Sequence, residues 1–191
     1  MKKVLVINGH PNFKASFANQ AILEELGKLL PAVKVHALSG ARGEKGFNVP
    51  EEQKLLREAD IVVFDFPVYW FSVPALLKEW FDEVLTHGFA YGTGGTALKG
   101  KTAVFSLTLG APEDSYRRDA ALGYTVKDLL APLFSTATYC SMQNAEPVYS
   151  AGMLYIPGVS TDEDLAAVKA KAKEHAERLA HLLKTLRSPS F

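Results

Sequence analysis

The stretch HPNFKASFANQ, from His10 to Gln20, gathers hydrogen-bond donors between a short apolar run and a helical pattern. His10 offers a ring N–H, Ser16 a hydroxyl and Asn19 an amide. Backbone N–H groups at the start of a helix, together with the helix dipole, attract an anion. The loop lacks the glycine patterns of P-loops and dinucleotide folds, which favours one phosphate over a triphosphate. The alternative is that Ser16 only caps a helix and His10 only fills a turn.

A second stretch, PVYWFSVP at positions 67–74, places large apolar side chains directly after an apolar run. Val68, Tyr69, Trp70 and Phe71 lie between two prolines. An exposed cluster of this kind is costly in a soluble protein unless something covers it. It can bury a flat heteroaromatic ring, a partner subunit or part of the chain's own core.

The third stretch, TLGA at positions 108–111, combines a hydroxyl at Thr108 with the small residues Gly110 and Ala111. Small residues let the backbone approach a ligand closely. A phosphate cradle, an aromatic wall and a small-residue edge together suit a ligand with one phosphate and a large planar ring. FMN is such a molecule, so the three stretches predict an FMN site.

The periodicity of apolar residues predicts the elements that carry these loops. Strands are expected over residues 4–7, 33–38, 61–66, 102–109 and 136–142, and helices over 16–30, 50–59, 74–86, 124–134 and 161–186. Alternating strands and helices indicate an α/β three-layer sandwich with a five-stranded parallel sheet, in the flavodoxin-like order 2-1-3-4-5. Ligands of such sheets lie beyond the carboxyl ends of the strands, where all three loops are expected.

Composition narrows the protein class. The 191 residues fit a single domain spanning 1–191, with 48% hydrophobic and 22% charged residues and a formal net charge of zero. This balance argues against a nucleic-acid binder. Cys140 is the only cysteine, so no intrachain disulfide can form and a cytoplasmic location is expected. No run is long enough to span a membrane, and no His or carboxylate spacing predicts a metal site.

The chain resembles the flavodoxin-like NAD(P)H:quinone oxidoreductases, a family that includes DT-diaphorase. Its likeness is greatest to the bacterial flavoproteins that accompany glutathione-gated potassium efflux. The resemblance rests on His10-Pro11 with Ser16-Phe17-Ala18-Asn19, on Ala59-Asp60 leading to residues 67–74, on HGFAYG at 87–92, and on residues 108–111. These stretches span roughly residues 1–150 in the order typical of the family.

The resemblance implies FMN, with FAD as the alternative flavin, and a ping-pong cycle in which NADH or NADPH reduces the flavin and a quinone-like acceptor reoxidises it. It also implies a homodimer with both sites at the subunit interface. Cofactor contacts are expected from His10, Ser16, Phe17, Ala18, Asn19, Pro67, Val68, Tyr69, Trp70, Phe71, Thr108, Leu109, Gly110, Ala111 and Tyr116. Substrate contacts are expected from Trp70, Phe71, Tyr91 and Gly110.

No side chain is assigned as a catalytic acid or base. Tyr116 occupies the position of an active-site tyrosine in DT-diaphorase, but the place of its histidine partner falls near Leu122. Ala111 replaces a glycine that is frequent in relatives and is expected to narrow the substrate slot. Two other functions stay open: an FMN-containing regulatory subunit peripherally associated with a potassium transporter, and a flavodoxin-type electron carrier.

Overall fold

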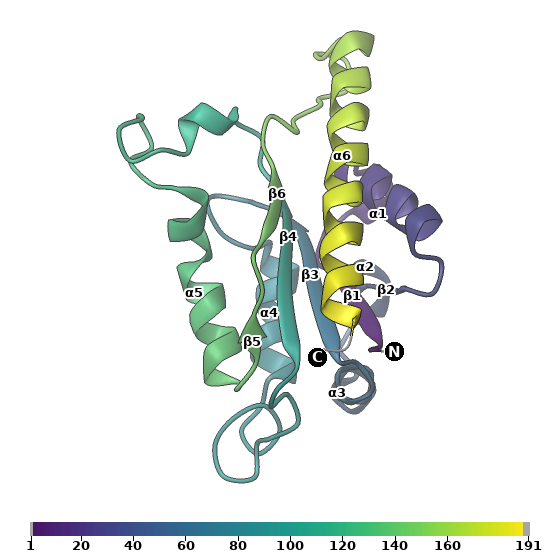
Figure 1. Cartoon of the computed structure of the whole chain (residues 1–191), viewed down its shortest axis with the longest axis vertical. Coiled ribbons are helices and arrows are strands. Elements are labelled where there is room, and N and C mark those ends of the chain that lie inside the picture. Colours follow the sequence, from purple (N-terminus) through teal and green to yellow (C-terminus); the bar gives the residue numbers. More distant parts are fainter. Residues whose placement is uncertain (1, 189–191) are drawn as a thin grey trace.

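A parallel sheet runs through the centre of the computed structural model, which describes residues 2–188 (Figure 1). Its strands are β1 (Val4–Asn8), β2 (Lys34–Ala37), β3 (Ile61–Pro67), β4 (Thr102–Thr108), β5 (Gln143–Asn144) and β6 (Val148–Ser150). The order is β2-β1-β3-β4-β5, and β6 also pairs with β4. The expected flavodoxin-like order and parallel direction are therefore confirmed.

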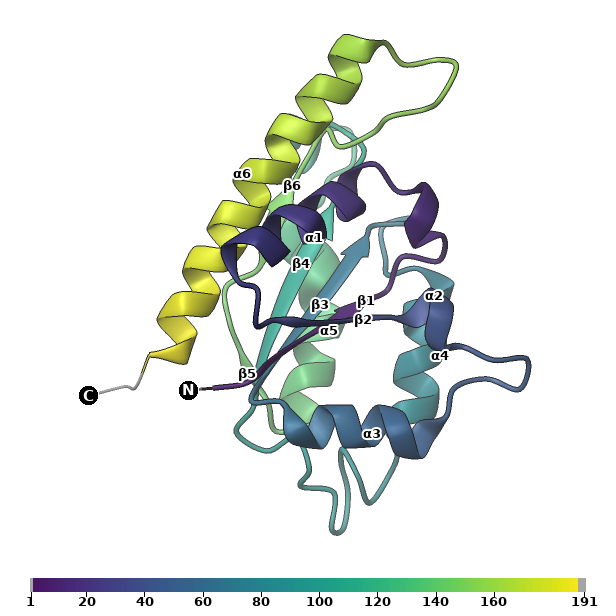
Figure 2. The ribbon, with the colours of Figure 1, turned by 90° about the vertical axis from the view of Figure 1, so that its right-hand side faces the viewer.

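Helices cover both faces of the sheet (Figures 1 and 2). Helices α1 (Ala18–Leu29) and α6 (Asp162–Arg187) pack on one face, and α3 (Val49–Glu58), α4 (Ala75–Val84) and α5 (Val126–Tyr139) pack on the other. Because successive strand residues point to opposite faces, Val4 and Val6 join the α1/α6 core while Leu5 and Ile7 join the other. Shorter elements are α2 (Leu38–Ala41), η1 (Phe13–Ala15) and η2 (Glu113–Ser115).

The expected fifth strand over residues 136–142 is wrong. Helix α5 runs through Pro132 to Tyr139, and the fifth position of the sheet is filled by the two short strands β5 and β6. Threonine and tyrosine favour strands and proline disfavours helix interiors, so the local signals were misleading. The helix continues because Leu130 and Ala137 are buried at helical spacing and the Thr136 hydroxyl donates to the Pro132 carbonyl.

The loop after β1 passes close to α4. A Cβ atom on Gly9 would lie 2.9 Å from the Leu77 Cβ, so only glycine fits without a shift of the helix. The Gly9 N–H also donates to the Asp65 carbonyl at 2.8 Å, which extends the β1–β3 ladder by one step. Gly9 thereby fixes the point at which the chain leaves the sheet and turns towards the loop that begins at His10.

Candidate functional site

A cavity of about 450 Å³ opens beyond the carboxyl ends of β1, β3 and β4. Its volume lies in the usual range for small-molecule sites. The lining residues come from all three predicted loops and from one further segment: His10, Asn12, Ala15, Ser16, Phe17, Ala18, Asn19, Pro67, Val68, Tyr69, Thr108, Leu109, Gly110, Met153, Leu154 and Tyr155. The topology thus brings together segments that are far apart in the sequence.

The His10 ring is held in one tautomer at the edge of this cavity. The Asn12 backbone N–H donates to His10 Nδ1 at 3.1 Å, so the proton of the neutral ring sits on Nε2. Burial lowers the pKa of His10, which keeps the ring neutral at physiological pH. The ring also packs edge-on against Tyr69, with centroids 6.2 Å apart. His10 therefore presents a fixed Nε2–H donor.

Ser16 lies just before α1. The structure starts this helix at Ala18 rather than at the expected residue 16, yet the Ser16 hydroxyl oxygen accepts the Asn19 N–H at 3.1 Å, as a helix cap does. The hydroxyl proton is left to donate to a second acceptor. Capping and anion binding are thus compatible roles for the same side chain.

Behind the cavity lies a buried polar group that the sequence analysis did not identify. Asn8, Asp65 and Ser106 sit side by side on β1, β3 and β4, all on the α1/α6 face. Asp65 is fully buried and accepts hydrogen bonds from Ser106 Oγ (2.9 Å), Asn8 Nδ2 (2.8 Å) and Asn19 Nδ2 (3.3 Å). Burial raises the pKa of Asp65 to about 6, although its three hydrogen bonds oppose the shift. The available signal was an aspartate inside an apolar strand.

The aromatic stretch forms a tight turn. The Tyr69 N–H donates to the Ser72 carbonyl at 2.9 Å and the Ser72 N–H donates back at 3.1 Å, while Trp70 (φ 48°) and Phe71 (φ 64°) both adopt left-handed conformations. Positive φ at two successive central residues is the geometry of a type I′ turn, which normally selects Gly or Asn. The side chain of Trp70 at this turn is 93% exposed. Backbone strain of this kind is concentrated at functional sites.

Not every predicted site residue lies in the main cavity. Phe71 and Tyr116 line a neighbouring cavity of about 460 Å³ with Leu122 and Tyr124, and Trp70 and Ala111 line neither. Tyr91 lies in a third cavity, where its ring is 5.3 Å from that of Tyr139. The roles of these residues stay predictions, and so do those of the residues that line the main cavity.

The segment that sequence reasoning missed is residues 153–155. It is drawn to the cavity because the Met153 N–H donates to the Leu109 carbonyl at 2.9 Å. Tyr155 packs edge-on against Phe17, with centroids 4.6 Å apart. Residues 153–155 follow β6, so a last strand predicted at residues 148–150 would have placed them just beyond a strand end. The sequence pattern instead predicted that strand at residues 136–142.

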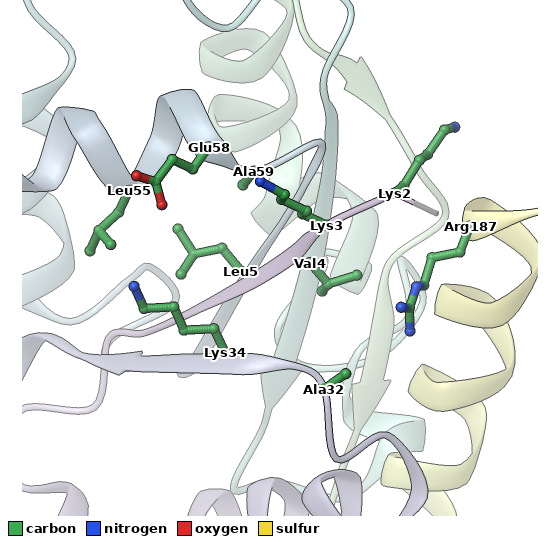
Figure 3. A pocket seen from close by; sticks show the side chains of 10 residues that line it. All are labelled: Lys2, Lys3, Val4, Leu5, Ala32, Lys34, Leu55, Glu58, Ala59 and Arg187. Atoms are coloured by element: carbon green, nitrogen blue, oxygen red, sulfur yellow. The ribbon is translucent and has the colours of Figure 1, made fainter.

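Another cavity, of about 300 Å³, opens at the amino ends of the strands (Figure 3). Lys2 and Lys3 extend from the start of β1, with Glu58 of α3 nearby (Figure 3). In open parallel sheets ligands bind at the carboxyl ends instead. We therefore assign the functional site to the cavity beside His10 and Ser16.

Comparison with known proteins decides the family. A model of the family described as having a flavodoxin-like fold matches residues 2–176. The chain belongs to this family. It is 40% identical to an uncharacterized NAD(P)H oxidoreductase, YrkL, of Bacillus subtilis over 182 residues, covering 95% of this chain and 98% of the relative. It is 43% identical over 146 residues to the glutathione-regulated potassium-efflux system ancillary protein KefG of Cronobacter sakazakii, covering 76% and 79%.

Solved structures of flavodoxin-like proteins show the same architecture. General stress protein 14 of Treponema denticola, solved in complex with FMN, aligns with a TM-score of 0.82 and 34% identity over 94% of this chain and 99% of that one. An NADPH-quinone reductase from P. pentosaceus aligns with a TM-score of 0.71 and 29% identity over 89% and 97%. The resemblance to oxidoreductases of this fold is therefore confirmed. Within residues 2–188, no helix is long and apolar enough to cross a membrane.

Proposed function

We propose that the protein is an FMN-dependent NAD(P)H:quinone oxidoreductase working by a ping-pong cycle. FMN, when bound, supplies the chemistry by accepting a hydride from NAD(P)H and passing two electrons to a quinone-like acceptor. The observation that carries the proposal is the cavity at the carboxyl ends of the strands. Its lining combines the His10 Nε2–H, the Ser16 hydroxyl and the start of α1 with Pro67–Tyr69 and Gly110.

The donor set suits one phosphate group. His10 and Ser16 each have a proton to donate, and α1 contributes backbone N–H groups and its positive dipole end. No Lys or Arg side chain lines the cavity within the described residues, so neutral donors must hold the anion. A single phosphate on a rigid donor cradle is what FMN offers. FAD would need further room for its adenosine end.

The residues around the planar part of the ligand have positioning roles. Val68 and Leu109 directly follow the adjacent strands β3 and β4, and the Val68 N–H donates to the Thr108 carbonyl at 2.8 Å. This bond fixes the edge of the cavity against which a ring would lie. Phe71 and Tyr116 line a second cavity together with Leu122, Leu129 and Pro132. We assign it to the alternating nicotinamide and quinone.

The relatives support this function. An NAD(P)H oxidoreductase, an NADPH-quinone reductase and a protein solved with FMN are among the similar proteins.

We also propose a homodimer in the cytoplasm. Trp70, Phe71 and Tyr139 are exposed large apolar side chains of the kind that a second copy would cover. Sedimentation of the purified protein as two chains would support the dimer, and a monomer would overturn it.

A second candidate function has one observation in its favour, the 43% identity to an ancillary protein of a potassium-efflux system. In that case the protein would bind FMN and dock peripherally on a transporter. Co-purification of the tagged protein with a potassium transporter from membranes would support it. Recovery of the protein without any transporter would favour a free reductase.

The test of the leading proposal is the visible spectrum of the FMN-loaded protein under anaerobic conditions. Addition of NADPH should bleach the flavin bands, and subsequent menadione should restore them. The same sequence with NADH gives the nucleotide preference. Flavin bands that NADPH and NADH leave unchanged would overturn the reductase and leave the carrier or regulatory subunit. A long-lived semiquinone during stepwise reduction would favour the one-electron carrier.

A further inference from the structure

Asp65 is a buried carboxyl group one side chain behind the cavity wall. Its partners within residues 2–188 are all neutral: Asn8 of β1, Asn19 of α1 and Ser106 of β4. Asn19 itself lines the cavity, so the carboxyl and any bound ligand share a neighbour. A buried carboxylate without a cationic partner is an expensive arrangement unless the group changes its protonation state.

The Oδ1 atom of Asp65 is held by a chain of hydrogen bonds that runs to the surface of α6. Ser106 Oγ donates to Asp65 Oδ1, so its oxygen accepts the Nε2–H of His175 at 2.9 Å. His175 Nδ1 then accepts the Ser150 hydroxyl at 3.0 Å, and Arg178 donates to Ser150 Oγ at 2.9 Å. Burial lowers the pKa of His175 to about 3, so this ring stays neutral.

Among the hydrogen-bond partners of Asp65, the Asn8 amide is the one that can change from donor to acceptor. Its Nδ2 donates to Asp65 Oδ2 at 2.8 Å, while its Oδ1 is buried without a partner among the described residues. Rotation of the amide by half a turn exchanges the two atoms, and which atom faces a partner follows the hydrogen bonds available. Asn8 Oδ1 would then face Asp65 Oδ2 and accept a hydrogen bond from the protonated carboxyl. One amide thus serves both the ionised and the protonated carboxyl.

We propose that Asp65 takes up a proton from solvent when the negatively charged cofactor enters the cavity, with the Asn8 amide turning from donor to acceptor. The step forms one O–H bond at Asp65 Oδ2 and removes one negative charge from behind the cavity. Ser106 continues to donate to Oδ1, and Asn19 continues to donate to Oδ2. The inference rests on the proposed FMN binding.

The direction follows from Coulomb's law. Two negative charges in a poorly solvated region repel, so a phosphate in the cavity raises the proton affinity of Asp65. Within residues 2–188, the other titratable groups near the network are His10 in the loop after β1 and His175 with Arg178 on α6. None of these offers Asp65 a direct cationic contact in the structure. An increase of about one pKa unit is expected for charges separated by roughly 10 Å.

Calorimetry of FMN binding at about pH 7, in two buffers of different ionisation enthalpy, measures the protons exchanged. With the pKa of Asp65 near 6 in the empty protein and about one unit higher in the complex, binding should take up roughly 0.4 proton. Asp65→Asn should abolish this uptake. Glu52→Gln is the matched control, because Glu52 is also buried but bonds to His36 and Trp80 in the other core. It should retain the uptake.

The pH dependence of FMN affinity in the unmodified protein shows whether binding takes up or releases a proton. By linkage, FMN should bind about threefold more tightly at about pH 6.5 than at about pH 8. Protonation of the FMN phosphate itself would act in the opposite direction. Equal proton uptake in the unmodified protein and Asp65→Asn, or the same pH dependence of FMN affinity in both between about pH 6.5 and 8, would overturn the inference while leaving FMN binding intact. No FMN binding at any pH would overturn both proposals.

Discussion

The Thr108 hydroxyl donates a hydrogen bond of 3.1 Å to the side-chain oxygen of Asn19, which lies 89 residues earlier in the chain. This bond ties the first turn of α1 to the end of β4, on the floor of the cavity. It also orients the Asn19 amide, so that its nitrogen faces Asp65. Two of the three predicted loops are therefore joined by side chains as well as by the sheet.

Thr108→Val should remove this hydrogen bond without changing the size of the side chain. The buried Asn19 oxygen would lose its donor, which is expected to lower the free energy of unfolding by about 1–3 kcal/mol. FMN affinity should fall as well, because Asn19 lines the cavity. Urea unfolding and FMN fluorescence titration measure the two effects. Thr102→Val, at the amino end of the same strand, is the control for FMN affinity and should leave it unchanged.

Trp70→Gly should separate stability from turnover. Trp70 has φ 48° and is 93% exposed in the single chain, so at a concentration where the protein is monomeric glycine relieves backbone strain while little apolar burial is lost. We expect the free energy of unfolding to rise by up to about 1 kcal/mol. The kcat/KM for menadione should fall about tenfold, equivalent to about 1.4 kcal/mol.

Ser141→Gly is the matched variant for that prediction. Ser141 also has positive φ, at 59°, but lies outside the cavities that contain the site residues. It should gain stability with unchanged turnover. A Trp70→Gly protein with full turnover would contradict the substrate contact expected from the Trp70 side chain.

Two buried groups should give the empty protein opposite pH dependences. The pKa of His175 is lowered from 6.5 to about 3, so the unfolded chain binds an extra proton between these values and stability falls as the pH falls. The pKa of Asp65 is raised from 3.8 to about 6, so the folded protein binds the extra proton and stability rises as the pH falls. Between about pH 4 and 6 the two contributions offset each other.

Asp65→Asn removes the contribution of Asp65 to the pH dependence of stability and leaves that of His175. Between about pH 6 and 4 the variant should lose about 1.4 kcal/mol more per pH unit than the unmodified protein. Above about pH 6.5 the difference in unfolding free energy should be constant. Urea unfolding at several pH values measures it, with Asp82→Asn on the surface as control. Parallel curves for Asp65→Asn and the unmodified protein would contradict the buried titration.

The sequence was sufficient for the sheet order and for much of the cavity, because both depend on local patterns. Buried strands such as Ile61–Pro67 are apolar runs, broken here only by Asp65, and loops at their carboxyl ends must meet. It failed where tertiary packing overrides propensity. Residues 136–139 have strand-forming character but lie in α5, whose buried face includes Ala137.

The polar group behind the cavity could not be inferred for a different reason. Asp65, Ser106 and His175 come from β3, β4 and α6, and the last two are separated by 69 residues. Their meeting depends on strand register and on the crossing of α6 over the sheet. Local patterns specify neither of these.

The measurement that tests the central claim most directly is the FMN affinity of the empty protein and of Ser16→Asp. Aspartate is as good a helix cap as serine, so α1 should be retained while a carboxylate faces the phosphate. Ser16→Asn, a neutral cap, controls for side-chain size. We predict at least about tenfold weaker binding for Ser16→Asp, equivalent to about 1.4 kcal/mol, and a much smaller loss for Ser16→Asn. Unchanged affinity in Ser16→Asp would contradict the assignment of the phosphate to this loop.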